Sequence, residues 1–184
     1  MSNSTLDAIF SRRSVRAYTE QKVDAEVIEL IAKAALAAPS GMNAQPVNVI
    51  VVDSKELLLE MEKDVIDHFV KAGNTAVVER MKSRNNKVLY DAPVAYVLAV
   101  KNNSSADVGI MAQNICIAAT SLGLGSIILG MPGAVFEAPE SAAKWNEKLG
   151  MPEGYKYGLA VAVGYAADEG KPHEIDLGKL SFVK

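Results

Sequence analysis

The sequence predicts a layered α/β domain in which helices cover a sheet. Short apolar segments rich in β-branched residues alternate along the chain with longer segments whose apolar residues recur every three or four positions. The 184 residues, of which 49% are hydrophobic, suit a single buried core. No internal repeat, low-complexity tract or linker divides the chain, so we expect one domain across residues 1–184.

The first half of the chain predicts a helix, a loop, a strand and a second helix. Asp24 is placed to cap the first helix, and Pro39 prevents its continuation. Residues 47–52 are apolar and β-rich, and Ser54 is then placed to cap the next helix. Residues 71–87 are polar and basic, which predicts a frayed helix or a mobile excursion that could cover a site.

The second half of the chain predicts three further strands and two further helices. The strands are expected at residues 93–100, 126–129 and 159–163, and the helices at residues 104–122 and 139–150. Gly123 is well placed to end the first of these helices. The tail over residues 175–182 alternates partly like a strand but has few local partners, so we expect it to pair with another chain.

The composition argues against nucleic-acid and membrane partners. A formal net charge of -3 at pH 7 offers no basic surface for DNA, RNA or anionic lipid. The longest apolar runs are too short to span a bilayer, and no charged-then-apolar leader opens the chain. Cys116 is the only cysteine, so no intrachain disulfide can form and we expect a cytoplasmic location.

The two histidines give no sign of a metal centre. His68 and His173 lie far apart in sequence, without cysteines or clustered carboxylates at ligand spacing, which argues against zinc. The sequence also lacks a Cys–His or His–carboxylate pattern typical of hydrolases. We therefore expect chemistry carried by an organic cofactor that the protein binds and orients.

An arginine-rich segment follows the first short helical stretch. Arg12, Arg13 and Arg16 stand within six residues together with two serines, Ser11 and Ser14. Guanidinium groups suit phosphate, so this segment is a candidate phosphate site. The alternative is a solvated basic turn, since charge clusters are common on protein surfaces.

The loop over residues 38–46 is a second candidate binding segment. Its proline and glycine fix a tight path, while Ser40, Asn43 and Gln45 offer both donors and acceptors. Such a mixed lining suits a planar heterocycle that carries carbonyls and ring nitrogens. The alternative is an ordinary loop whose polar side chains satisfy its own backbone.

A third candidate is the end of the strand that follows the long apolar helix. Most of residues 109–130 are expected to be scaffold, and their glycines form neither a dinucleotide-binding nor a phosphate-loop motif. Gly130 and Met131 would nevertheless let a flat ring approach backbone amides, one of which could donate a hydrogen bond to a ring nitrogen.

Taken in this order, the segments resemble the nitroreductase family of FMN-dependent oxidoreductases from about Leu6 to Tyr165. The matching residues are 12–16, 39–46, 90–94, 123–130 and 158–165. The resemblance implies an α+β fold with a mixed β-sheet flanked by helices. It also implies an intertwined homodimer with two FMN sites at its interface, which fits the pairing expected of the tail.

The resemblance also implies which residues hold the cofactor. Those expected to hold the FMN phosphate, the ribityl chain and the pyrimidine edge are Arg12, Arg13, Ser14 and Arg16. Those expected to come from the partner subunit are Pro39, Ser40, Met42, Asn43 and Gln45. Those expected to line one face and edge of the flavin, with the Gly130 amide directed at N5, are Ile128, Leu129, Gly130 and Met131. No side chain need act as an acid or a base.

The chain departs from the family pattern in three places. Val47 stands where many relatives have an aromatic residue. The basic pair that relatives often carry near the phosphate is missing, and Lys171 is the obvious substitute. Relatives with an extended middle place an Asn and a Lys near the pyrimidine side of the flavin, and Lys87 matches that lysine only loosely; a cation there would raise the flavin's potential.

In function, the resemblance implies an oxidoreductase that uses NADH or NADPH to pass hydride through flavin N5 to nitroaromatic, quinone or other conjugated small-molecule acceptors. If nicotinamide and acceptor use the same flavin face, they must bind in turn, which predicts ping-pong kinetics. One alternative is an FMN-binding protein without reductase activity, such as a sensor or a flavin-dependent dehalogenase or dehydrogenase. Another is an interaction module with a decayed site.

Overall fold

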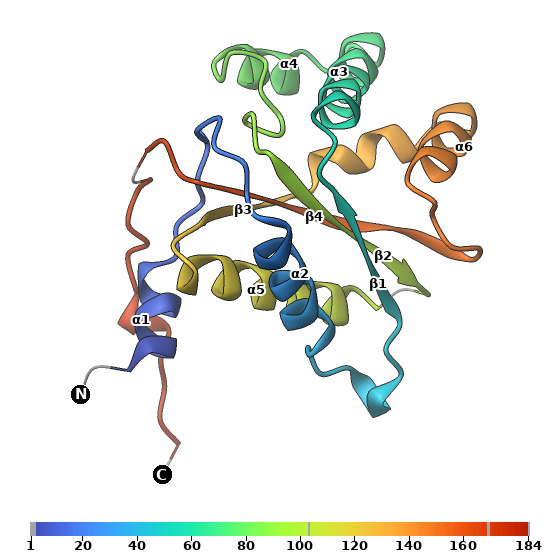
Figure 1. The fold of residues 1–184 in the computed structure, drawn as a ribbon. Coiled ribbons are helices and arrows are strands. Elements are labelled where there is room, and N and C mark those ends of the chain that lie inside the picture. The colour runs from blue at the N-terminus through green and yellow to red at the C-terminus, as the bar shows by residue number, and fades with distance from the viewer. Residues whose placement is uncertain (1–2, 103, 169, 184) are drawn as a thin grey trace.

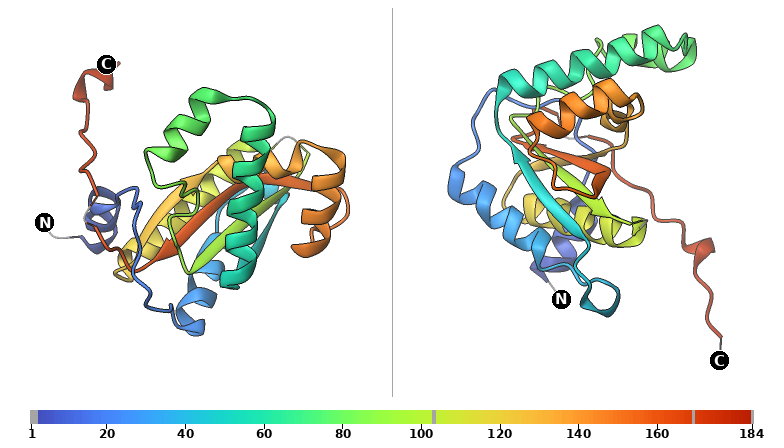
Figure 2. Two further views of the ribbon diagram at one scale, coloured as in Figure 1. Left: turned by 90° about the horizontal axis from the view of Figure 1, so that it is seen from above. Right: turned by 90° about the vertical axis from the view of Figure 1, so that its right-hand side faces the viewer.

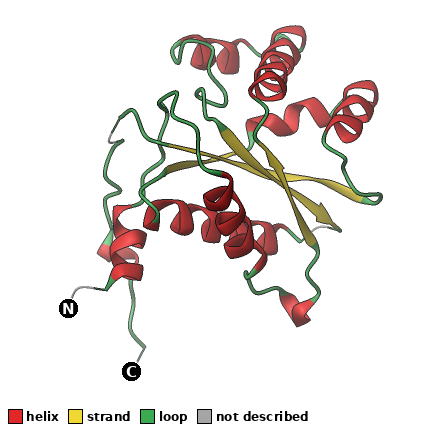
Figure 3. Ribbon diagram, viewed as in Figure 1, coloured by secondary structure: helices red, strands yellow, loops and turns green. Residues whose placement is uncertain are grey.

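The structure, a computed structural model, describes residues 3–102, 104–168 and 170–183 and arranges them in three layers (Figure 1). A four-stranded sheet lies between two layers of helices, which Figure 3 shows in yellow and red. The strands, in their order across the sheet, are β1 (Val47–Val52), β2 (Val94–Lys101), β4 (Tyr155–Gly164) and β3 (Gly125–Leu129). The helices are α1 (Ser4–Ser11), α2 (Ala25–Leu36), α3 (Lys55–Lys71), α4 (Thr75–Lys82), α5 (Ser105–Ser121) and α6 (Pro139–Lys148).

All neighbouring strands of this sheet pair in antiparallel fashion. Strands that alternate with helices along a chain usually form a parallel sheet, so the α/β expectation drawn from that alternation is wrong. The α+β class implied by the family resemblance is confirmed. Within the described residues, the parallel component is an isolated bridge between Ser14 and Ser126, beside the edge strand β3.

The two faces of the sheet carry separate apolar cores because the central strands β2 and β4 are apolar on both sides. On β2, Val97 joins the core beneath α3, α4 and α6, whereas Tyr96 and Leu98 join the core against α2 and α5. All three side chains are fully buried. Helices α3, α4 and α6 therefore form one outer layer, and α1, α2 and α5 form the other (Figure 1).

Helix α6 is fastened to α3 by a shared carboxylate. Asp64 Oδ2 accepts hydrogen bonds from Lys144 Nζ at 2.6 Å and from Trp145 Nε1 at 3.0 Å. The Trp145 side chain is fully buried, so this bond satisfies an indole N–H that water does not reach. The 3₁₀ segment η2 (Met131–Phe136) packs against both helices, which fixes the chain directly after Gly130.

Most of the predicted elements are confirmed, but two segments differ, and Asp24 precedes α2 without the expected side-chain cap hydrogen bond. Ser54 caps α3 as expected, its hydroxyl accepting from Leu57 N at 3.3 Å. Residues 71–87, expected as a frayed or mobile excursion, contain the regular helix α4, because the side chain of Asn74 caps its start. Strand β4 begins at Tyr155, four residues earlier than predicted.

The tail forms no strand within the described chain. It contains one 3₁₀ turn, η3 (Leu177–Lys179), and otherwise runs away from the body of the molecule (Figure 2). Its apolar side chains are largely exposed, with Phe182 at 79%. The pairing of this tail with another chain stays a prediction.

Candidate active site

The arginine-rich segment is held along the sheet edge by backbone hydrogen bonds on both of its sides. Val15 N donates to Ser126 O at 3.1 Å, and Ala167 N donates to Ala17 O at 2.9 Å. The buried Val15 fits against β3 because Gly125 has no side chain, since a Cβ there would lie 2.6 Å from Val15 Cγ2. The segment is thereby fixed between β3 and the chain that leaves β4.

This pairing brings the residues that follow β4 beside the arginines. A cleft of about 530 Å³ is lined by Arg12, Arg13, Ser14, Arg16, Asp168, Gly170, Lys171, Pro172 and His173. Three arginines and one lysine thus line the cleft together with one aspartate, and this set of cationic donors suits a phosphate. Lys171, expected as the substitute for the missing basic pair, lies with the arginines.

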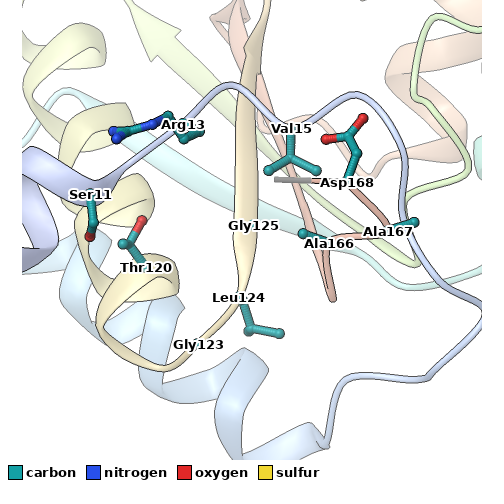
Figure 4. A pocket seen from close by; sticks show the side chains of 10 residues that line it. All are labelled: Ser11, Arg13, Val15, Thr120, Gly123, Leu124, Gly125, Ala166, Ala167 and Asp168. Carbon is teal, nitrogen blue, oxygen red and sulfur yellow. The ribbon is translucent and has the colours of Figure 1, made fainter. Parts of the chain in front are cut away.

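A neighbouring hollow of about 410 Å³ shares Arg13 and Asp168 with this cleft. In the view of Figure 4, these two side chains lie on either side of Gly125, where β3 begins. The Arg13 guanidinium donates through Nη1 to Phe10 O at 2.7 Å and to Arg12 O at 2.9 Å, which holds it near the end of α1. The polar end of the site is therefore built from α1, the β3 edge and the chain after β4.

Strand β3 connects this polar end to Gly130. With a rise of about 3.4 Å per residue, roughly 14 Å separates Ser126 from Gly130. Along the strand Leu129 is buried in the core, whereas Ile128 is 41% exposed. A Cβ placed on Gly130 would meet nothing within 4 Å, so its backbone borders open space.

An aromatic cleft adjoins Gly130 on the η2 side. It measures about 670 Å³, and Gly130, Met131, Phe136 and Tyr157 are among the residues that line it. The rings of Phe136 and Tyr157 stack with centroids 5.1 Å apart and planes at 19°. Flat apolar walls of this kind suit an aromatic molecule.

The loop that was expected from a partner subunit does not reach the arginine cleft of its own chain. It forms the 3₁₀ turn η1 (Gly41–Asn43), which lies at the opposite end of the helical layer from α1 (Figure 1). Met42, Asn43 and Gln45 have left-handed backbone angles, with φ of 52°, 53° and 46°. Pro39, Ser40 and Gln45 line a separate hollow of about 320 Å³.

Side-chain contacts hold this loop in its conformation. Gln45 N donates to Ser40 Oγ at 2.9 Å, and Gly41 N donates to Asp107 Oδ1 at 3.3 Å. Met42 itself is fully exposed. The loop is thus braced against α5 while its tip points into solvent.

Lys87 also lies apart from the arginine cleft, in contact with its own chain. Its Nζ is 2.6 Å from Asp91 Oδ1 and 3.9 Å from Glu62 Oε1. The hydrogen bond to the Asp91 carboxylate raises the pKa of Lys87. Lys87 therefore stays protonated, and its charge is paired with the carboxylates of Asp91 and Glu62.

Sequence reasoning missed several polar groups at or near these clefts. Asp168 and His173 flank Lys171 in the arginine cleft, and the position of Lys171 was the signal that could have found them. Tyr157 was missed because the strand was predicted to begin only at residue 159, which left Tyr157 outside it. Glu62 was missed because a carboxylate on an amphipathic helix usually faces solvent.

The single cysteine is not a candidate nucleophile. Cys116 is fully buried, and burial raises the pKa of its thiol, so the reactive thiolate is disfavoured. Among the residues that the structure describes, no group of three or more His, Cys, Asp or Glu side chains could hold a metal ion. No helix in the described part of the chain is long and apolar enough to cross a bilayer.

The family model of the nitroreductase family matches residues 9–165 of this chain. The chain belongs to the nitroreductase family. A nitroreductase from Desulfitobacterium hafniense DCB-2, solved with bound FMN, is 36% identical and superimposes with a TM-score of 0.95, with all of both chains covered. The family resemblance drawn from the arginine segment, the loop and the glycine-ended strand is confirmed.

Two curated relatives of this nitroreductase family member extend the comparison. A protein from Archaeoglobus fulgidus, provisionally named NADH dehydrogenase/NAD(P)H nitroreductase, is 34% identical over 93% of this chain and 90% of its own. The NADPH-flavin oxidoreductase of Vibrio harveyi is 30% identical over 89% of this chain and 66% of its own.

The residues present in this family member fit FMN by their own chemistry. The arginine cleft supplies several cationic donors for a phosphate, and the backbone at Gly130 leaves room for a flat ring to approach. These two places lie at the two ends of β3, with the exposed Ile128 between them. A single chain therefore brings together the arginines and the strand end, but not the loop over residues 39–45.

Proposed function

We propose that this chain is an FMN-dependent NAD(P)H oxidoreductase that reduces nitroaromatic, quinone or other conjugated acceptors. The observation that carries the proposal is the meeting of Arg12, Arg13, Arg16 and Lys171 in one cleft at the start of β3, with an open backbone at Gly130 beyond its end. The similarity along the full chain to an FMN-bound nitroreductase supports it.

The roles of the residues follow from their chemistry. Arg12, Arg13 and Arg16, with Lys171, would hold the FMN phosphate by charge-assisted hydrogen bonds. The N–H of Gly130 would donate to the edge of the ring, and Met131 would line it. Bound FMN supplies hydride transfer chemistry, so no side chain of this chain need act as an acid or a base.

We further propose that two copies of the chain form the site as a homodimer. In that assembly Pro39, Ser40, Met42, Asn43 and Gln45 of one protomer complete the cofactor site of the other. Their distance from the arginine cleft within one chain supports this arrangement (Figure 1).

Exposed apolar side chains on the same helical layer support the dimer. They are Leu6, Ile9 and Phe10 on α1, Leu30 and Leu36 on α2, and Ile110 on α5. The extended apolar tail adds Ile175, Leu177, Leu180 and Phe182. Apolar surface of this extent usually marks an interface.

The experiment that tests the function is an anaerobic titration of the FMN-loaded protein with NADH and, separately, with NADPH. We expect the flavin absorbance to bleach with at least one of them and to return when nitrobenzene or a benzoquinone is added. Initial rates measured while both substrates vary should give parallel double-reciprocal lines, because one cleft serves both in turn.

Three outcomes would contradict the proposal. A yellow protein that neither nicotinamide bleaches would be an FMN-binding protein without reductase activity, such as a sensor or a dehalogenase. A colourless protein that does not bind added FMN would lack a functional FMN site. Intersecting lines would mean that both substrates bind together.

A cytoplasmic location and a single-domain organisation over residues 1–184 are also proposed. The lone, buried cysteine supports the first. The common sheet shared by both apolar cores supports the second.

A further inference from the structure

A cleft of about 700 Å³ lies between the segment that follows Tyr18, the first two turns of α3 and the turn before β2. None of the residues predicted to hold FMN lines it. Its volume falls within the roughly 300–1,000 Å³ typical of small-molecule sites. The cleft is therefore a candidate binding site apart from the arginine cleft. Of the residues predicted to hold FMN, Lys87 contacts two that line it, Glu62 and Asp91.

One part of the wall of this α3 cleft is apolar. Val23, Leu58 and Leu89 line it and are 7%, 5% and 3% exposed, so the side chains are fixed by packing on their other sides. Pro93 and Val94 continue the wall toward β2. A ligand held here needs an apolar body.

A buried carboxylate gives the cleft a specific polar group. Glu62 lines it and is only 7% exposed. Its Oε2 accepts from Val88 N at 2.6 Å and from Leu89 N at 2.7 Å. Among the described residues, the cation nearest to Oε1 is Lys87 at 3.9 Å, beyond hydrogen-bond distance, so Oε1 can accept from a ligand.

The charged residues around the α3 cleft favour a cation. The acidic residues that line it are Glu20, Asp53, Glu62 and Asp91, and the basic ones are Lys22 and Lys55. Lys87 lies outside the lining but pairs with Asp91 and Glu62, so four carboxylates against three ammonium groups leave an excess of one negative charge. A cationic group beside Glu62 would thus be favoured both by its nearest oxygen and by the surrounding field.

We propose that the α3 cleft binds a small organic monocation with an apolar body, such as a primary arylalkylamine. Its ammonium group donates to Glu62 Oε1, and its apolar body packs against Val23, Leu58 and Leu89. A neutral analogue of the same shape lacks the charge-assisted hydrogen bond and binds more weakly.

The test uses the FMN-loaded protein, 2-phenylethylamine as the probe and 2-phenylethanol as its neutral match. Calorimetric titration should show the amine bound at least about tenfold more tightly than the alcohol. Glu62→Gln should weaken binding of the amine by at least about tenfold. Glu56→Gln is the matched control on the exposed side of the same helix and should leave the affinity unchanged.

A second variant and a second readout cover the case in which Glu62→Gln does not fold. Asp53→Asn, at the rim of the cleft, should weaken binding of the amine severalfold. The backbone amide resonances of Val88 and Leu89 should shift when the amine is added but not when the alcohol is added. Equal binding of amine and alcohol, no binding of the amine, or unchanged affinity in both variants would overturn the proposal. Competition by NADH or a change in flavin absorbance would place the amine at the cofactor and would also overturn it.

Discussion

The hydroxyl of Tyr157 donates a 2.9 Å hydrogen bond to the carbonyl oxygen of Leu129, one residue before Gly130. The bond joins β4 to the last residue of β3, where the proposed flavin edge begins. Burial raises the pKa of Tyr157, so its hydroxyl keeps its proton and remains a donor. The position of the open backbone at Gly130 thus depends on a side chain of the neighbouring strand.

Replacing Tyr157 by phenylalanine should lower the free energy of unfolding by about 0.5–1.5 kcal/mol, because one hydrogen bond is lost while the ring packing is kept. Urea denaturation of the two proteins measures this difference. Tyr155→Phe is the matched control on the same strand, since within the described chain the Tyr155 hydroxyl makes no hydrogen bond. An equal decrease in the free energy of unfolding in both variants would argue against a special role of the hydrogen bond to Leu129.

Replacing Gly130 by alanine should separate cofactor binding from folding. The added Cβ meets no other atom of the chain within 4 Å, so stability should change by no more than about 0.5 kcal/mol. The methyl group would intrude where the ring is proposed to approach, so FMN should bind about tenfold more weakly.

Gly125→Ala is the opposite case, because its Cβ would lie 2.6 Å from Val15 Cγ2. We expect this change to destabilise the fold by about 1–3 kcal/mol. Fluorescence titration with FMN and urea denaturation distinguish the two variants. Normal FMN affinity in Gly130→Ala would remove the Gly130 backbone from the cofactor site.

Arg12→Ala and Arg16→Ala should each weaken FMN binding by about 1.5–3 kcal/mol per charge-assisted hydrogen bond lost. Lys171→Ala should weaken it in the same direction, since all three side chains line one cleft. Dissociation constants from flavin fluorescence measure the effect. Arg80→Ala, on the exposed face of α4, serves as the control. Wild-type FMN affinity in all three test variants would show that the FMN phosphate binds elsewhere.

The contact between α3 and α6 should weaken in acid. Hydrogen bonds from Lys144 and Lys148 lower the pKa of Glu60. Because the folded-state pKa lies below the unfolded value, these ion pairs stabilise the fold above the ordinary glutamate pKa, and their contribution is lost as pH falls through the folded-state pKa.

The Glu60→Gln variant tests this pH dependence. Denaturant unfolding from neutral pH to about pH 3 should show a stability difference between wild type and variant that shrinks in acid. Asp67→Asn, whose partner Lys63 lies on the same helix, is the control without a link to α6. A pH-independent difference at Glu60 would show that its charge is not what stabilises the contact.

The elements that were predictable from the sequence are those with strong local signals. The strand at Val47–Val52 has the predicted bounds because an apolar β-branched run stands between a proline and a capping serine. Residues 71–87 were predicted only as a frayed helix or a mobile excursion, because their polar and basic composition gives little apolar periodicity. The side-chain cap at Asn74 that starts the regular helix α4 was not identified. Antiparallel pairing was not predictable from the order of elements, since strand direction depends on long-range packing.

For the site, residue types were more predictable than positions. Guanidinium chemistry identified the arginine segment, but its closeness to Lys171 depends on backbone pairing between residues 14–19 and the chain after β4. The location of Lys87 against Glu62 and Asp91 depends on the packing of α3, which no local pattern reports.

The left-handed backbone at Met42, Asn43 and Gln45 limits how the loop before β1 can vary. Glycine or asparagine would adopt these angles readily, whereas valine, isoleucine or threonine would add roughly 1–2 kcal/mol of strain at each position. Combinatorial libraries that aim to widen the range of acceptors should therefore exclude β-branched residues at these three sites. Such libraries should instead vary the residues that line the aromatic cleft beside Gly130, where no left-handed backbone angle restricts the choice of side chain.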